Sequence, residues 1–292
     1  MEDHSLMRER IRLPLIIPVD PYLRDHHFEG RVILPAAEIL QRLAGSVQAY
    51  SSDAYVRCIR SASFDKFLQI EEYSQVIEAC HELEVCESGR IISKLITINR
   101  IRGAMIRTRV HAVAHFVKAG VHIAGSHTDM TLSQGGRCYE ITSQKLYSDL
   151  VSFGPSYRNV RDVVFLWETG AMAKVFAADH PAPLEPLGSP FPFDGALHVA
   201  CAWGQRFHHI VAFPVGFEER FIVKPTARGE TYICEISSVS ATEKSLQFDI
   251  WIRDSAGSLC EEIRGVVMRD VSGGRIKPPR WVLYRPPVGS DA

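Results

Sequence analysis

The sequence lacks the features of a membrane-spanning, secreted or disulfide-stabilised protein. No apolar run reaches the roughly 18 residues of a membrane-spanning helix, and Pro14 and Pro18 interrupt the short apolar stretch near the N-terminus, which excludes a signal peptide. The only asparagines, Asn99 and Asn159, begin no glycosylation sequon. The seven cysteines include no CxxC pair, a pattern typical of buried free thiols in a reducing compartment. We therefore expect a cytoplasmic protein with no membrane partner.

An excess of charge of either sign is also missing. The 292 residues include 33 basic and 34 acidic side chains, so no global field attracts nucleic acid or anionic lipid. The sequence contains no P-loop, no GxGxxG and no HExxH motif, so we expect no nucleotide cofactor and no metal. With 46% hydrophobic residues, the chain has enough apolar surface to fold into a globular unit.

Alternation of apolar and polar residues dominates the chain. Period-two patterning separated by turn residues predicts antiparallel strands with one solvated face. A hairpin turn is expected at residues 254–257. The predicted strands cover residues 56–67, 74–85, 90–101, 105–117, 160–167, 171–177, 218–223, 231–238, 245–253 and 258–270.

Two segments break the strand pattern and predict helices. Residues 35–50 carry apolar side chains at helical spacing, with Pro35 in the favoured first turn. Residues 194–209 form the second candidate, with Asp194 as the N-cap. Each half of the chain therefore holds one apolar helix among antiparallel strands. We predict an α+β tandem repeat, with repeats at residues 1–120 and 141–292 and a linker at 121–140 that is rich in Gly, Ser, His and Thr.

Three local features, in order along the chain, bear on chemistry. His26, Gly30 and Pro35 precede the first helix, the segment 153–155 (Phe-Gly-Pro) lies after the linker, and Asp194 and His198 open the second helix. A His before one buried helix and an Asp at the start of another offer a base and an acid. Taken singly, each has a structural reading, since Asp at a helix start usually serves as a cap.

Together these features resemble the dehydratase domains of polyketide and polyunsaturated-fatty-acid synthases, which fold as a double hotdog of two tandem antiparallel sheets, each wrapped around a central helix. The family motif HxxxGxxxxP is met by His26, Gly30 and Pro35. Its YGP motif is met in altered form by Phe153, Gly154 and Pro155, with Tyr157 following, and its DxxxQ/H motif by Asp194 and His198. Their order and wide separation also fit the family, and the resemblance covers nearly the whole chain.

The resemblance implies a dehydratase that removes water from a 3-hydroxyacyl thioester carried on the phosphopantetheine arm of an acyl carrier protein. His26 would be the base, because the ordinary pKa of His, about 6.5, lies near the working pH. Asp194 would be the acid, with an apolar tunnel favouring its protonated form, and His198 would hydrogen-bond and orient Asp194. No cofactor is implied.

The remaining motif residues would bind or shape the substrate site. Gly30 would allow close approach of the acyl chain, and Gly154 with Pro155 would fix a tight strand entry. Two residues depart from the family pattern: Ala36 follows the motif proline where Gly is usual, and Phe153 replaces the usual Tyr. A backbone N–H at the start of the first helix would still polarise the thioester carbonyl.

Other interpretations stay open at this point. The same fold and acid–base pair serve isomerases and cyclisation domains of the product-template type, and Phe153 favours such divergence. A non-catalytic acyl-binding or scaffolding domain is the alternative outside enzymes. A metal pair at His26 and His27 is disfavoured because adjacent residues point apart in an extended segment. The C-terminal residues, rich in proline, predict an extended tail or a docking strap, with a solvated tail as the default, and unpaired sheet edges are compatible with a homodimer.

Overall fold

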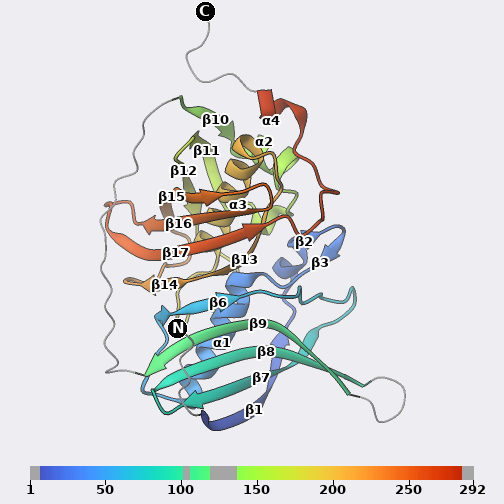
Figure 1. Cartoon of the computed structure of the whole chain (residues 1–292), viewed down its shortest axis with the longest axis vertical. Coiled ribbons are helices and arrows are strands. Elements are labelled where there is room, and N and C mark those ends of the chain that lie inside the picture. Colours follow the sequence, from blue (N-terminus) through green and yellow to red (C-terminus); the bar gives the residue numbers. More distant parts are fainter. Residues whose placement is uncertain (1–6, 101–105, 119–136, 285–292) are drawn as a thin grey trace, which may run out of the picture.

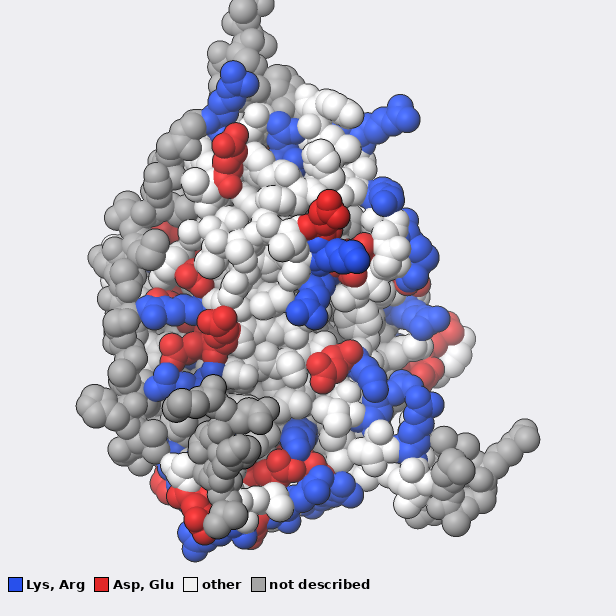
Figure 2. All heavy atoms as spheres, viewed as in Figure 1, with Lys and Arg blue, Asp and Glu red and all other residues white. Residues whose placement is uncertain are grey.

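The computed structural model describes residues 7–100, 106–118 and 137–284. Each half has one long helix inside a curved antiparallel sheet, and Figure 1 shows the sheet bending around α1 in one half and around α3 in the other. Acidic and basic side chains are interspersed over the face drawn in Figure 2. No helix within the described ranges is long and apolar enough to cross a membrane.

The N-terminal half places α1, Ala36–Tyr50, against the long strands β7, β8 and β9. The apolar positions of α1 from Ala37 to Val47 are buried, as their spacing predicts. The strands of this half are β1 (Met7–Pro18), β2 (His27–Phe28), β3 (Arg31–Val32), β4 (Ala54–Tyr55), β5 (Cys58–Ile59), β6 (Ser61–Ser63), β7 (Val76–Cys86), β8 (Arg90–Arg100) and β9 (Ile106–Lys118).

The C-terminal half surrounds α3, Phe191–Phe207, with its own strands. Every residue of α3 from Phe191 to Gln205 is buried, so this is a core helix that is apolar nearly all round. The other elements are β10 (Tyr139–Thr142), α2 (Ser143–Lys145), β11 (Val160–Trp167), β12 (Gly170–Phe176), β13 (Phe213–Phe217), β14 (Glu219–Ile222), β15 (Thr231–Ala241), β16 (Ser245–Arg253), β17 (Leu259–Arg269) and α4 (Arg280–Tyr284).

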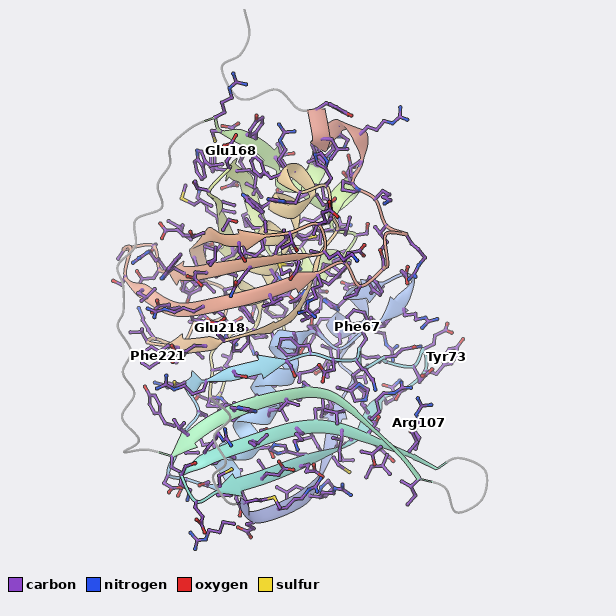
Figure 3. All side chains as sticks on the ribbon, in the orientation of Figure 1. Phe67, Tyr73, Arg107, Glu168, Glu218 and Phe221 are labelled. Carbon is purple, nitrogen blue, oxygen red and sulfur yellow. The ribbon has the colours of Figure 1, made fainter. Side chains whose placement is uncertain are left out.

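Short strands join the two halves into one hydrogen-bonded sheet. β6 pairs with β13 and β5 pairs with β14, so the strand order runs from β1 at one edge to β10 at the other. Gly216 permits this pairing, because a Cβ there would lie 2.4 Å from the carbonyl oxygen of Ala62. Figure 3 shows Glu218 and Phe221 along this seam, and the Phe221 ring lies 6.3 Å from that of Tyr55 in the other half.

A buried ion pair lies at the same seam. Arg220 of β14 donates two hydrogen bonds to Glu261 of β17, at 3.0 and 2.7 Å, and both side chains are almost completely buried. The Arg220 guanidinium also lies 4.5 Å from the centre of the Phe193 ring at the start of α3. Removing either charge would leave the other buried without a partner, which is strongly destabilising.

The start of the second helix was predicted wrongly. α3 begins at Phe191, three residues before the predicted N-cap, and Asp194 lies inside its first turn, where its N–H donates to the carbonyl of Pro190 at 3.1 Å. The two prolines, Pro190 at the N-cap and Pro192 in the first turn, are a better start signal here than the carboxylate. The predicted hairpin turn at 254–257 is confirmed between β16 and β17.

Both ends of the described chain carry structure that the patterns did not predict. β1 is a long strand despite Pro14 and Pro18, because it lies at a sheet edge and pairs with β7 alone. The predicted solvated tail is wrong as far as residue 284, since Arg206 donates to the carbonyls of Val282 and Leu283 in α4. Of the predicted linker, residues 121–136 lie outside the described residues, and residues 139 and 140 belong to β10.

Candidate active site

A cavity of about 460 Å³ lies between the two halves and is lined by residues of both. Most of the predicted site residues line it: His26, Gly30, Ala36, Phe153, Asp194 and His198. Pro35, Gly154 and Pro155 do not line it. Residues that sequence analysis did not select also take part, among them Phe28, Phe67 and Phe213, whose rings cluster at centroid distances of 4.9 and 4.7 Å. Figure 3 shows Phe67 on the side of the β2–β3 hairpin, where it is partly exposed.

The β2–β3 hairpin positions His26. Its turn residues Glu29 and Gly30 have φ values of 47° and 73°, the left-handed conformation that a two-residue turn of this kind requires. The turn therefore accounts for Gly30, whose Cβ would meet no protein atom within 4 Å, and the close approach of an acyl chain to it stays a prediction. At the base of the hairpin, the N–H of Ile33 donates a hydrogen bond to the carbonyl of His26.

His26 is held in one neutral tautomer. Its Nδ1 lies 2.9 Å from the carbonyl oxygen of Ile33, which can only accept, so Nδ1 carries the proton and Nε2 keeps its lone pair. Burial lowers the pKa of His26 to about 4, against an opposing effect of the Asp194 charge. A His with these properties is uncharged at neutral pH and has a free nitrogen to accept a proton.

Phe153 is stacked on the His26 ring, with centroids 4.4 Å apart and planes inclined by 18°. The same phenyl ring lies 4.8 Å from His198, so Phe153 contacts the rings of both His26 and His198. The side chain that replaces the usual Tyr thus supplies a flat apolar surface beside the base and contributes to the burial that lowers its pKa.

Asp194 and His198 face each other on successive turns of α3. The carboxylate Oδ2 lies 3.1 Å from Nε2 of His198, and both side chains are almost completely buried. The predicted contact is present, yet it lacks hydrogen-bond alignment, and neither atom has another hydrogen-bond partner among the described residues. Asp194 and His26 come from different halves and line the same cavity.

Asp25 was missed by sequence analysis and links the first motif to the second. Its carbonyl accepts the N–H of Gly154 at 2.8 Å, and its carboxylate accepts the N–H of Ser156 at 2.8 Å. A Cβ at Gly154 would lie 2.4 Å from Asp25 Oδ1, so this approach needs glycine. Pro155 begins a 3-10 turn, Pro155–Tyr157, that leads into β11 at Val160.

Two tyrosines near the histidines were also missed as site residues. The Tyr147 hydroxyl lies 3.1 Å from Nδ1 of His198 and accepts the N–H of Val160 at 2.8 Å. Tyr157 packs edge-on against His26 at 5.1 Å, and its buried hydroxyl has no hydrogen-bond partner within the described ranges. Burial raises the pKa of both tyrosines well above the ordinary value, so both are neutral.

A second buried carboxyl lies on α1 close to this site. Glu38 accepts a hydrogen bond from the Tyr22 hydroxyl at 2.9 Å and lies 3.7 Å from Arg42. Burial raises the pKa of Glu38 to about 7, with Arg42 opposing the shift. Tyr22 in turn lies 6.2 Å from Tyr157, so the carboxyl is connected to the ring that packs on His26.

The geometry supports a cysteine nucleophile or a metal site less well than it supports an acid–base pair. Cys201 lines the cavity, but burial raises the pKa of its thiol to about 11, which keeps it neutral, as expected for the core residue that the sequence predicted. His27 lines the cavity beside His26. Over the described ranges, no group of three His, Cys, Asp or Glu side chains is placed to hold a metal ion.

Comparisons with known proteins agree with this architecture. The structure is similar to a trans-AT polyketide synthase dehydratase domain from Brevibacillus brevis, at 17% identity and a TM-score of 0.67 over 90% of this chain and 94% of that one. It is also similar to the dehydratase domain of the CurF module of the curacin polyketide synthase, at 14% identity and a TM-score of 0.71 over 91% and 96%. These likenesses confirm the double-hotdog fold.

A third similar structure is a bifunctional dehydratase-cyclase domain in ambruticin biosynthesis, at 15% identity and a TM-score of 0.65 over 90% of this chain and 92% of that one. No curated protein matches the sequence. A family model does: the one described as the polyketide synthase dehydratase N-terminal domain matches residues 131–276, half of the chain. The chain therefore belongs to the polyketide synthase dehydratase family.

Proposed function

We propose that the chain is a hydro-lyase that removes water from a 3-hydroxyacyl thioester to give a 2-enoyl thioester. The observation that carries this proposal is the neutral His26, with its free Nε2, in the same buried cavity as the carboxyl of Asp194. Dehydration needs a base for a C–H proton and an acid for a departing hydroxyl. The cavity holds one group of each kind, contributed by different halves of the chain.

The reaction balances with these two groups alone. His26 Nε2 takes the proton from C2, the electron pair of that C–H bond forms the C2–C3 double bond, and the C3–O bond breaks. The protonated Asp194 carboxyl gives its proton to the leaving hydroxyl, so water departs. His26 is then protonated and Asp194 ionised, and the pair is reset when the proton returns through water. Each positioned group contributes on the order of 10²–10⁴-fold to such a rate.

The start of α1 supplies the electrophilic side of the site. Ala36 is the first residue of the helix and lines the cavity. The first N–H groups of a helix have no intrahelical acceptor and carry partial positive charge. We assign these groups to the thioester carbonyl, where negative charge develops as C2 loses its proton. Ala36 supplies the same N–H as the usual Gly, and its methyl group takes up part of the space.

The substrate we propose is carried by an acyl carrier protein on its phosphopantetheine arm. The cavity lining supports an acyl chain, since it is rich in apolar side chains such as Leu34, Ile39, Leu197 and Val211. The arm would bring the thioester into the cavity to the level of His26 and Asp194. Homodimer formation stays a prediction.

Intact-protein mass spectrometry of a carrier loaded with a 3-hydroxyacyl group tests the proposal. We expect the loaded carrier to lose one water with the wild type and with His208→Phe, a control at the far end of α3. Neither His26→Phe nor Asp194→Asn should change the mass, and both should also fail to hydrate a 2-enoyl carrier. Water loss that persists in either variant would overturn the assigned roles.

An isomerase or cyclase is the second candidate, and two observations favour keeping it. Phe153 lacks the hydroxyl of the usual Tyr, and one similar structure is a dehydratase-cyclase. A substrate that changes its chromatographic retention with no change in mass would identify this activity. Carrier binding with neither change, across several acyl chain lengths, would instead favour a scaffolding domain and overturn both enzyme readings.

A further inference from the structure

The Tyr147 hydroxyl has one proton and two neighbours, and its direction can be worked out. The backbone N–H of Val160 donates to the Tyr147 oxygen at 2.8 Å. That oxygen also lies 3.1 Å from Nδ1 of His198. Since Val160 supplies a donor, the only acceptor in this pair of contacts is His198 Nδ1, and the Tyr147 O–H therefore donates to it. Tyr147 is buried, so an unpaired hydroxyl proton would be costly.

This direction sets the tautomer of His198. An Nδ1 that accepts a hydrogen bond carries no proton, so the proton of the neutral ring is on Nε2. Nε2 is the nitrogen that lies 3.1 Å from Oδ2 of Asp194. His198 thus presents an N–H to the carboxyl, while His26 presents a lone pair to the cavity. The two histidines hold opposite tautomers, each fixed by the partner of its Nδ1.

We propose that Tyr147 is a positioning residue of the acid, which acts through His198. By fixing the Nε2–H tautomer, it places an N–H and not a lone pair 3.1 Å from Oδ2 of Asp194, which favours Oδ1 as the oxygen that carries the proton transferred to the substrate hydroxyl. This inference rests on the proposed dehydratase reaction for its kinetic consequence. The tautomer itself is a property of the free protein and can be measured without substrate.

The opposite tautomer would remove the acid. With its proton on Nδ1, His198 would turn the Nε2 lone pair towards Oδ2, where it would either take the acidic proton of Asp194 or repel the carboxylate. Loss of the Tyr147 hydroxyl permits this state, because nothing then donates to Nδ1. We expect Tyr147→Phe to lower kcat roughly 10- to 100-fold with little change in KM, the size of effect typical of lost orienting partners.

The chain offers a matched control for the lost backbone bond. The Tyr232 hydroxyl also accepts a backbone N–H, from Ala227 at 2.7 Å, and the side chain is also buried, but Tyr232 does not line the cavity. Tyr232→Phe therefore removes the same kind of bond and should leave kcat unchanged. A drop in kcat that is shared by both variants would mark a general loss of stability.

Two measurements decide the proposal. In ¹⁵N-histidine NMR of the free protein, we expect His198 to be protonated at Nε2 in the wild type and to shift towards Nδ1 protonation in Tyr147→Phe. In a double-mutant cycle, Tyr147→Phe should lower kcat in the wild-type background and have almost no further effect in His198→Leu. An Nδ1–H tautomer in the wild type, an unchanged tautomer in Tyr147→Phe, or additive losses would overturn it. A wild type that dehydrates no substrate, with the Nε2–H tautomer observed, would instead contradict the proposed function alone.

Discussion

The pH dependence of the reaction is the most direct consequence of the burial of His26. Burial lowers its pKa to about 4, while the negative charge of Asp194 opposes the shift and is outweighed. A base must be unprotonated to work, so the acid limb of kcat/KM should fall near pH 4. An ordinary exposed His would place this limb near its reference pKa of about 6.5.

The difference between the two cases is large at pH 5. A group with a pKa of about 4 is about 90% neutral there, whereas one with a pKa of about 6.5 is about 3% neutral. The buried site therefore predicts roughly 30-fold more active base at pH 5 than an exposed histidine would give. Activity between pH 5 and pH 7 should consequently change by less than a factor of about two on this limb.

The assay is the initial rate of dehydration of a 3-hydroxyacyl thioester at low substrate concentration, between pH 4 and pH 8. Stability must be followed in parallel, because a His whose folded-state pKa lies below its unfolded value costs stability as pH falls from about 6.5 towards 4. The buried His81, whose pKa is also lowered to about 4, acts in the same direction. Circular dichroism at each pH separates unfolding from titration. A limb near pH 6.5 in a fully folded protein would refute the reasoning.

Three substitutions test the packing of the site and of the seam. Gly154→Ala should lower kcat and destabilise the fold by roughly 1–3 kcal/mol, because its Cβ would lie 2.4 Å from Asp25 Oδ1; urea denaturation and the rate assay measure the two effects. Gly45→Ala should instead stabilise the fold, because the added Cβ would make only an ordinary van der Waals contact. We expect the unfolding free energy to rise by roughly 0.5–1 kcal/mol from helix propensity. Arg220→Met should lower the unfolding free energy by roughly 3–5 kcal/mol by leaving Glu261 buried without its partner; an effect under about 1 kcal/mol would contradict a buried, paired arginine.

The sequence was informative where local patterning determines structure. The apolar spacing of residues 35–50 predicted α1, and the alternation of residues 74–117 predicted the long strands β7 to β9. His26 and Asp194 were selected by motif spacing, and the structure brings both to one cavity. Periodicity and motifs succeed in these cases because the relevant residues lie within a few positions of one another.

Contacts between distant residues could not be predicted in the same way. Asp25 accepts the N–H of Ser156, 131 positions away, and Tyr147 meets His198, 51 positions away. Nothing in the local sequence of either residue identifies its partner, because the first contact depends on how the two halves pack and the second on how α3 packs within the C-terminal half. The sequence likewise did not indicate the role of Phe153. The sequence shows a missing hydroxyl, whereas the structure shows a ring stacked on the base.

Two errors have a common physical origin. Asp194 was predicted as the N-cap because Asp is a favoured N-cap residue, yet the helix begins earlier, at Phe191, and Pro192 fits its first turn, where the missing N–H costs nothing. β1 was not among the predicted strands, and its two prolines are tolerated because a strand at the sheet edge has one side without ladder bonds. In both cases the effect of proline depends on its position in the element.

The division of the acid and the base between two halves makes the seam a part of the active site. The pairing of β5 with β14 and of β6 with β13 helps to hold His26 and Asp194 in place, and each of these pairings spans two residue pairs. The bonds from Asp25 to the 154–156 segment also cross this short junction, and the buried pair of Arg220 and Glu261 anchors β14 to β17 on one side of it. Each half has its own central helix, while one apolar core runs through both, so a weakened seam can shift the acid relative to the base before either helix unfolds. We therefore expect Arg220 variants to lose activity at lower denaturant concentrations than those at which they unfold.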